Sequence, residues 1–265
     1  MKTYKQVFEK LDRAALIPFF VIGDPDFKTS LSIVKTAIDA GADILELGIP
    51  FSDPIADGPT IQKADIRSLQ NGMSVKKALE FIRKVKDYKD VPIGLLMYYN
   101  LIYQYGAEKF FSDFHKAGVN SVLVADLSID DADEITAPAR AAGLDTVFMV
   151  TPNTDTERIK LIASKTTGFI YTVSLLGVTG SRESLSNTVT GLVAKLKKLT
   201  SIPICVGFGI SKPQHAATIA AAGADGVIIG SKIVELIEQN LSNRKKLLSE
   251  IAKFLREVKT AIRNK

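Results

Sequence analysis

Short apolar runs alternate with amphipathic stretches along the whole chain. Between the runs, apolar residues recur three or four positions apart, as in Phe110, Phe111, Phe114 and Ala117, which is typical of helices. Strands that alternate with such helices predict parallel βαβ units. The eight runs predicted to be strands are residues 16–22, 43–47, 92–97, 121–125, 146–150, 169–173, 203–206 and 226–229.

A glycine-containing phrase precedes several of these runs, at residues 40–43, 117–120, 142–145 and 222–225. Its glycine fits the C-terminal cap of a helix, and a strand follows at once. Eight βα units close a barrel of typically about 250 residues, so we expect the α/β class and a single (β/α)8 TIM barrel, one catalytic domain over residues 1–265. An open doubly wound sheet is the alternative.

Two further helices are expected outside the repeat. Residues 1–11 read as an extra N-terminal helix across the bottom of the barrel. Residues 60–69 read as an inserted helix after strand 2, ahead of the regular helix at residues 74–88.

Composition narrows the setting without changing the fold class. The chain is 46% hydrophobic and 24% charged, which excludes a disordered or fibrous protein. Its apolar runs fall short of the roughly 20 residues that span a bilayer, no secretory signal pattern opens it, and the single cysteine, Cys205, excludes an intrachain disulfide. We therefore expect a cytoplasmic protein without membrane contact. The net charge of +5 is spread over many helical faces, which favours a solvated surface over a nucleic-acid site.

Two carboxylates lie close together near the second run. The period of two along a strand places Ile44, Glu46 and Gly48 on one face and Leu45 and Leu47 on the other, so Glu46 is expected to face the barrel mouth. A buried carboxylate is costly, and general acid/base chemistry is the functional interpretation. The structural alternatives are a paired glutamate and, for Asp57 in Asp-Gly-Pro, a turn or helix cap.

Glycine-rich turns follow the sixth, seventh and eighth runs, at residues 177–181, 207–211 and 230–231. They predict an anion site of backbone amides, with Ser211 and Ser231 as helix N-caps, because this end of a barrel commonly binds phosphate. Residues 177–187 suit a lid that closes over a bound ligand.

No lysine ends a predicted strand, and His115 and His215 are predicted to be solvent-facing helix residues, so neither an imine-forming site nor a metal site is expected. Proton-transfer chemistry on a phosphorylated substrate remains, either isomerisation or carbon–carbon cleavage.

Taken together, the sequence motifs of this chain resemble those of the tryptophan synthase alpha subunit family, and the resemblance covers essentially the whole chain. The most specific is residues 46–59, and the others are residues 17–25, 97–100, 171–180, 206–210 and 229–231. The resemblance implies a lyase that cleaves indole-3-glycerol phosphate to indole and glyceraldehyde 3-phosphate in tryptophan biosynthesis. It further implies a beta-subunit partner that carries pyridoxal phosphate, an α2β2 heterotetramer, and no cofactor or metal in this chain.

The resemblance also assigns roles to residues. Glu46 matches the acid/base glutamate, Asp57 the aspartate at the indole N–H, and Tyr171 a substrate-positioning tyrosine. The indole contacts are Phe19, Leu96 and Phe208, the lid residue that reaches Asp57 is Thr179, and the phosphate contacts are Gly180, Gly209, Gly230 and Ser231. The partner contacts are Pro50, Phe51, Ser52, Asp53, Asn100, Asp126 and Ser128.

The chain departs from the family pattern at Val21, where threonine is common, at Tyr99, where a small residue is usual, and at residues 125–128, where Ala-Asp-Leu-Ser replaces Pro-Asp-Leu-Pro. Ser128 and Tyr99 put the strength of docking in question more than the chemistry. A stand-alone indole-releasing lyase, a mainly activating subunit with little chemistry of its own, and another phosphate-binding barrel such as a sugar-phosphate isomerase are the alternatives.

Overall fold

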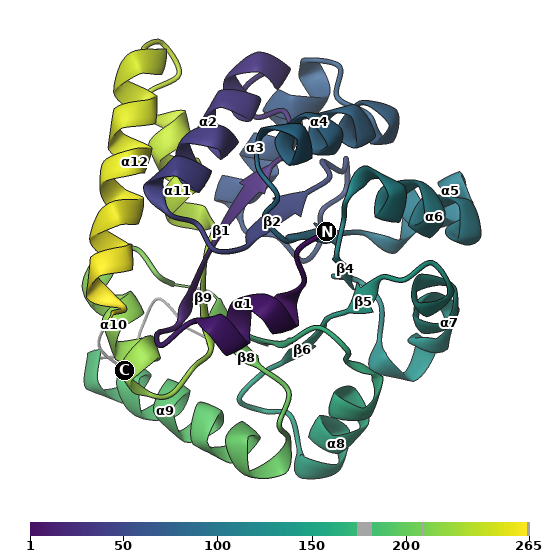
Figure 1. The fold of residues 1–265 in the computed structure, drawn as a ribbon, viewed down its shortest axis with the longest axis vertical. Helices are drawn as coiled ribbons and strands as arrows, with labels where there is room; N and C mark the ends of the chain where they lie inside the picture. Colours follow the sequence, from purple (N-terminus) through teal and green to yellow (C-terminus); the bar gives the residue numbers. More distant parts are fainter. Residues whose placement is uncertain (174–181, 208, 264–265) are drawn as a thin grey trace.

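A ring of parallel strands forms the centre of the molecule in this computed structural model, which describes residues 1–173, 182–207 and 209–263 (Figure 1). The strand order is β5-β4-β3-β2-β1-β9-β8-β7-β6. Only Val147 separates β5 from β6, so the chain itself closes the ring and these two segments share one barrel position. The strands are β1 (Ala15–Val21), β2 (Leu45–Gly48), β3 (Ile93–Met97), β4 (Ser121–Val124), β5 (Asp145–Thr146), β6 (Phe148–Val150), β7 (Ile170–Val173), β8 (Ile204–Gly207) and β9 (Gly226–Ile229).

Helices surround this ring and confirm the predicted (β/α)8 barrel (Figure 1). The glycines of the recurring phrase lie at helix ends with positive φ, from +83° at Gly143 to +104° at Gly41 and Gly118, as a C-terminal cap requires. The helices are α1 (Tyr4–Lys10), α2 (Phe27–Ala40), α3 (Pro59–Gln70), α4 (Val75–Tyr88), α5 (Tyr99–Tyr105), α6 (Ala107–Ala117), α7 (Asp133–Ala141), α8 (Thr156–Lys165), α9 (Arg182–Leu199), α10 (Pro213–Ala221), α11 (Ser231–Glu238) and α12 (Arg244–Ala261), with a 3-10 turn at Ile129–Asp131.

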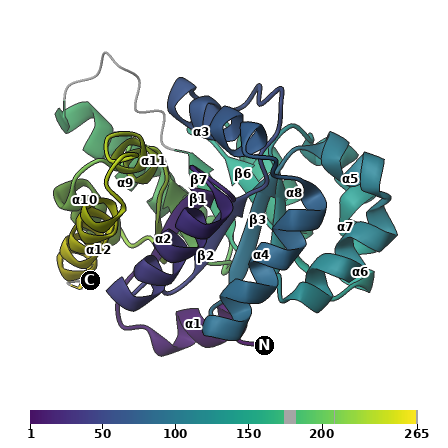
Figure 2. The same cartoon turned by 90° about the horizontal axis from the view of Figure 1, so that it is seen from above.

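The two helices expected outside the repeat lie at opposite ends of the barrel (Figure 2). Helix α1 closes the end where the strands begin: the Tyr4 hydroxyl lies 2.6 Å from the Ser121 hydroxyl, and the Tyr4 ring meets Phe169 edge-on. Helix α3 packs against α11 and β1 at the other end. Both predictions are confirmed, and the open end of the barrel is the one where the strands finish.

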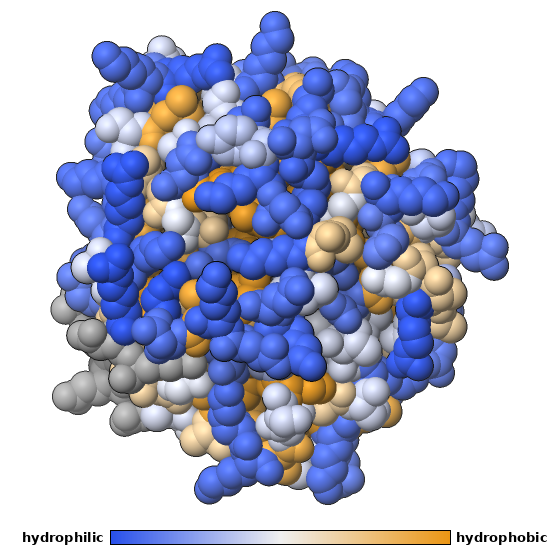
Figure 3. Space-filling model, in the orientation of Figure 1, coloured by the Kyte–Doolittle hydropathy of each residue, from blue (hydrophilic) through white to orange (hydrophobic). Residues whose placement is uncertain are grey.

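Side chains alternate between an inner and an outer core along each strand. Leu45 and Leu47 belong to the outer core beneath the helices, while Ile44 belongs to the inner core, so Glu46 takes the inward position that the period of two predicts. The face of the molecule drawn in Figure 3 is mainly hydrophilic, with small scattered apolar patches. Within the described segments, no helix combines the length and apolar character that a membrane crossing needs.

Candidate active site at the C-terminal end of the strands

A cavity of about 360 Å³, here called the Glu46 cavity, opens where the strands finish. The predicted site residues that line it are Phe19, Glu46, Asp57, Leu96, Tyr171, Gly209, Gly230 and Ser231. Three predicted residues, Thr179, Gly180 and Phe208, lie outside the described part of the chain, as do residues 177–181 of the predicted lid. Ser211 of the predicted anion site lines the cavity too, and residues to which sequence reasoning gave no role complete the lining: Gly58, Thr60, Ile61, Ile210, Ile228, Lys232 and Glu235.

Glu46 points into this cavity from the middle of β2 and is 3% exposed. Its Oε2 atom has no hydrogen-bond partner among the described residues. Burial, together with the nearby negative charge of Asp57, raises the pKa of Glu46 to about 8. The side chain therefore carries a proton over most of the neutral range, and the alternative of a glutamate in an ion pair finds no support.

Asp57 lies in the loop between β2 and α3, where Gly58 is the N-cap residue and Pro59 occupies the first helical turn. The Tyr98 hydroxyl donates to Asp57 Oδ2 at 2.7 Å and accepts from the Ala56 amide at 3.0 Å. Burial raises the pKa of Asp57, and the Tyr98 hydrogen bond opposes that shift. Asp57 is thus held by a residue of the next barrel unit and does not cap the helix through its side chain.

Two aromatic rings reach the mouth because glycines lie beside them. A Cβ atom at Gly48 would lie 2.9 Å from Phe19 Cζ, and one at Gly207 would collide with the Tyr171 hydroxyl. Burial, together with the charges of Glu46 and Asp57, raises the pKa of Tyr171 well above its usual range, so the phenol stays neutral. Phe19 and Tyr171 therefore supply apolar surface and one neutral hydroxyl to the cavity.

A third buried carboxyl, Asp65 on α3, is 5% exposed and does not line the cavity. Burial is the main cause that raises the pKa of Asp65 to about 8, and the charge of Asp57 adds to it, while the Phe51 backbone amide opposes the shift. The sequence gives little indication that Asp65 is buried, because a polar residue on an amphipathic helix is ordinarily assigned to the solvent face.

The glycine turns after β8 and β9 meet at the other end of the cavity. Gly209 has φ of +71°, and α11 begins at Ser231 directly after Gly230. The prediction that Ser211 and Ser231 are N-caps is wrong: the caps are Lys212 and Gly230, neither with a side-chain capping bond. The backbone amides at the start of α11 remain available to an anion, which does not depend on a serine cap.

His115 and His215 both lie on helices, α6 and α10, as predicted, and each is half-buried. His215 Nδ1 lies 3.2 Å from the Gly209 carbonyl oxygen and 3.4 Å from the Ser211 amide nitrogen, so this ring supports the anion loop. His115 packs near Gly143, and its buried Nδ1 has no partner within the described segments. Over the same segments, no group of His, Cys, Asp or Glu could hold a metal ion.

The predicted partner contacts follow the neighbouring strands β2, β3 and β4 and form a rim on one side of the same mouth. Ser52, Asp53, Asn100, Asp126 and Ser128 are exposed, but Pro50 is buried and Phe51 is half-buried. Phe51 stacks on Tyr98 with ring centroids 5.0 Å apart, so it packs inside the loop more than it faces outward. The Tyr99 hydroxyl bonds to Glu134, and Ser128 contacts Asp130 and Arg158.

Comparison with known proteins agrees with this geometry. The family model described as tryptophan synthase alpha chain matches residues 6–263. The tryptophan synthase alpha chain of Methanothermobacter thermautotrophicus is 44% identical over 259 residues, covering 98% of this chain and 96% of the relative. That of Desulfatibacillum aliphaticivorans is 44% identical over 266 residues, covering 99% and 100%.

Solved structures show similarity to the same family. Tryptophan synthase subunit alpha from Legionella pneumophila superposes with a TM-score of 0.92 at 31% identity, covering 100% of both chains. A chain of the Pyrococcus furiosus tryptophan synthase complex superposes with a TM-score of 0.85 at 37% identity, covering 94% of this chain and 98% of that one. The chain belongs to the tryptophan synthase alpha chain family.

Proposed function

We propose that this chain cleaves indole-3-glycerol phosphate to indole and glyceraldehyde 3-phosphate, the lyase step of tryptophan biosynthesis that supplies indole to a beta subunit. The observation that carries the proposal is the buried Glu46, whose raised pKa favours the protonated form, in one cavity with Asp57 and with a turn of glycine amides. Membership of the family supports the same reaction.

The cavity offers a place for each part of this substrate. Phe19 and Leu96 lie on its walls and suit the faces of an indole ring, with Phe208 proposed as a third contact. Asp57 accepts the ring N–H, and Thr179 of the lid is proposed to reach it on closure. The proposed phosphate contacts at the opposite end are Gly180, Gly209, Gly230 and Ser231.

The reaction needs one proton delivered and one removed. Protonated Glu46 gives its proton to C3 of the indole ring, and the positive charge that develops at the ring nitrogen is balanced by the Asp57 carboxylate. The Glu46 carboxylate then takes the proton of the hydroxyl on the adjacent carbon. The carbon–carbon bond breaks, its electron pair returns to the ring, and the hydroxyl carbon leaves as the aldehyde. Tyr171 positions the substrate beside Glu46.

These steps use side chains alone, since no cofactor is needed to move either proton. Pyridoxal phosphate belongs to the beta subunit of the complex. We propose that the beta subunit docks on the rim of Ser52, Asp53, Asn100, Asp126 and Ser128 in an α2β2 heterotetramer. Residues from β1 through α11 line the active site, so we propose that residues 1–265 act as one catalytic domain. We propose separately that the chain works in the cytoplasm.

Indole release by the purified chain, with indole-3-glycerol phosphate as substrate, tests the proposal. Glu46→Gln keeps the shape of the side chain but removes its proton chemistry, so we expect kcat to fall by about 10²-fold or more, with KM changed much less. Asp57→Asn removes the counter-charge at the ring nitrogen and should also remove most activity.

Asp65→Asn is the matched control, because it makes the same change at a buried carboxyl that does not line the cavity. It should retain most of the wild-type rate. A Glu46→Gln chain that kept more than half of the wild-type kcat would refute the assigned role, and a wild-type chain that released no indole, alone or with a beta subunit, would refute the proposed reaction.

A further inference from the structure

The wall of the barrel is open between β4 and β6. Strand β4 pairs with β5 at Ser121↔Asp145 and Val122↔Thr146, and the last backbone bond runs from the Val147 amide to the Val122 carbonyl oxygen at 3.0 Å. Beyond that point β6 pairs with β7, and the described strands form no ladder between β4 and β6. Beyond the bond between Val147 and Val122, no strand pairing among the described residues closes this wall of the barrel.

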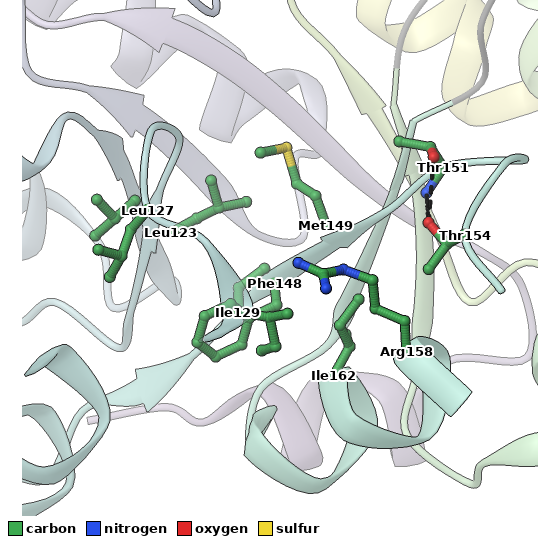
Figure 4. A pocket seen from close by; sticks show the side chains of 11 residues that line it. Leu123, Leu127, Ile129, Phe148, Met149, Thr151, Thr154, Arg158 and Ile162 are labelled. Atoms are coloured by element: carbon green, nitrogen blue, oxygen red, sulfur yellow. Dashed lines mark hydrogen bonds between the residues drawn. The ribbon is translucent and has the colours of Figure 1, made fainter. Parts of the chain in front are cut away.

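A second cavity, of about 280 Å³, fills this opening, and we call it the wall cavity (Figure 4). Inward-facing side chains of the inner core and outward-facing ones of the outer core both line it, as expected for a gap between two strands. Its lining is mostly apolar and consists of Leu123, Val124, Leu127, Ile129, Val147, Phe148, Met149 and Ile162, with Thr151, Thr154 and Arg158 as the polar members.

The polar members have partners of their own. The Arg158 guanidinium donates to Asp130 at 2.9 Å and to the Ser128 hydroxyl at 3.3 Å. The Thr151 backbone amide donates to the Thr154 hydroxyl at 3.0 Å (Figure 4), and the two threonine hydroxyls lie 3.2 Å apart. With its cation balanced by Asp130, the cavity suits an uncharged, apolar group.

The wall cavity lies next to the Glu46 cavity. Leu96 pairs in register with Leu123, and Tyr171 pairs in register with Met149, each pair on neighbouring strands and on the inward face. Leu96 and Tyr171 line the Glu46 cavity, whereas Leu123 and Met149 line the wall cavity. The four side chains thus form one arc around the mouth, and its two middle members separate the cavities.

We propose that Leu123 and Met149 determine which indole rings the lyase site accepts, by closing off the wall cavity as a side pocket for a substituent on the benzene edge of the ring. The proposal rests on the proposed function. A bulky substituent has to displace these two side chains in the wild-type chain, and packed cores resist such displacement. Truncating either one joins the two cavities and gives an apolar substituent an apolar space.

The test uses the reverse reaction, in which indole and glyceraldehyde 3-phosphate condense. Indole is compared with its 4-, 5-, 6- and 7-bromo derivatives in the wild-type chain and in Met149→Ala and Leu123→Ala. The measured quantity is kcat/KM for each bromoindole divided by kcat/KM for indole. We expect this ratio to rise at least about tenfold for one or more ring positions, the scale at which a hydrophobic pocket discriminates one small group.

Ile129→Ala is the matched control, because it enlarges the same cavity from its far side and leaves the arc intact. Its ratios should stay at the wild-type values, as should those of the conservative Met149→Leu. Ratios unchanged in both truncated variants, or raised equally in Ile129→Ala, would overturn the proposal.

Crystals of Met149→Ala grown with the bromoindoles give a second measurement that does not depend on turnover. Anomalous scattering from bromine is expected in the wall cavity, between β4 and β6. Bromine found in the Glu46 cavity alone would overturn the proposal even if the variant were inactive. Failure of the proposed function appears separately, as a wild-type chain that does not turn over unsubstituted indole.

Discussion

Glu46 combines an inward strand position, an unpartnered Oε2 among the described residues and a pKa of about 8. Each property follows from the one before it. The alternation of β2 turns the side chain inward, the inner core removes water, and removal of water favours the protonated acid. A carboxyl that is protonated at neutral pH can first donate a proton and then accept one. A retro-aldol cleavage that uses a single acid/base residue requires both steps.

The same shift makes the stability of the chain depend on pH through Glu46. The folded-state pKa of about 8 lies above the ordinary value of 4.5, so between those values the unfolded chain binds fewer protons than the folded one. Stability due to this group is therefore fully present below pH 4.5 and is lost as the pH rises toward 8.

We expect Glu46→Gln to become progressively more stable than the wild-type chain as the pH rises from 4 to 9, because the amide has no proton to lose. Urea denaturation across that range measures the difference in free energy of unfolding. Asp57 and Asp65 also have raised pKa values and are present in both chains, so the difference between the chains reports on Glu46 together with its interaction with Asp57. A difference that stayed constant with pH would contradict the burial argument.

At the scale of the element, the loop between β2 and α3 is organised by a residue outside it. The Tyr98 ring stacks on Phe51, and its hydroxyl bonds both to Asp57 and to the Ala56 amide. One side chain at the end of β3 thus holds both ends of the segment that carries Asp57. The tyrosine is recognisable in the sequence only as part of the phrase at residues 97–100.

Tyr98→Phe keeps the stacking and removes both hydrogen bonds. A hydrogen bond to a charged group contributes about 1.5–3 kcal/mol, so we expect kcat to fall by about 10- to 100-fold while the fold is retained. Steady-state indole release measures the effect. Tyr99→Phe is the control, since it removes a neighbouring phenol that bonds to Glu134 on the outer rim. Equal kinetics in both variants would show that Asp57 needs no anchor.

At the scale of the whole molecule, the Glu46 cavity and the exposed rim of Asp53, Asn100, Asp126 and Ser128 lie at the same end of the barrel. A protein docked there contacts the loop that carries Asp57. Its binding free energy can therefore favour one arrangement of that loop over others. We therefore expect docking and catalysis to be coupled through this shared loop.

We expect a saturating beta subunit to raise the lyase rate at least about tenfold, which corresponds to about 1.4 kcal/mol of coupling. Asn100→Ala should reduce this activation more than it reduces the basal rate. Glu9→Ala, an exposed residue on α1 at the opposite end, is the control and should leave activation unchanged. If the beta subunit leaves the wild-type rate unaltered, the chain works as an independent lyase, and Ser128 and Tyr99 are the first positions to examine.

Local features of this protein could be predicted from the sequence. The alternation of Leu45, Glu46 and Leu47, the helix-ending glycines such as Gly41 and the inserted helix α3 all emerged as predicted. Each depends on residues a few positions apart, whose backbone geometry and periodicity act before any distant contact forms. The closing of eight βα units into a barrel follows from the repetition of one such local unit.

Only the tertiary structure decided which distant groups meet. The true helix caps at Lys212 and Gly230, the half-buried His215 and the Tyr98 anchor all depend on how separate barrel units pack. The wall cavity arises because register places the last rung between β4 and β5 below Leu123 and Met149, which no local pattern encodes. Sequence periodicity sets the face on which a side chain lies, whereas its neighbours, its exposure to water and hence its pKa depend on residues brought together from elsewhere in the chain.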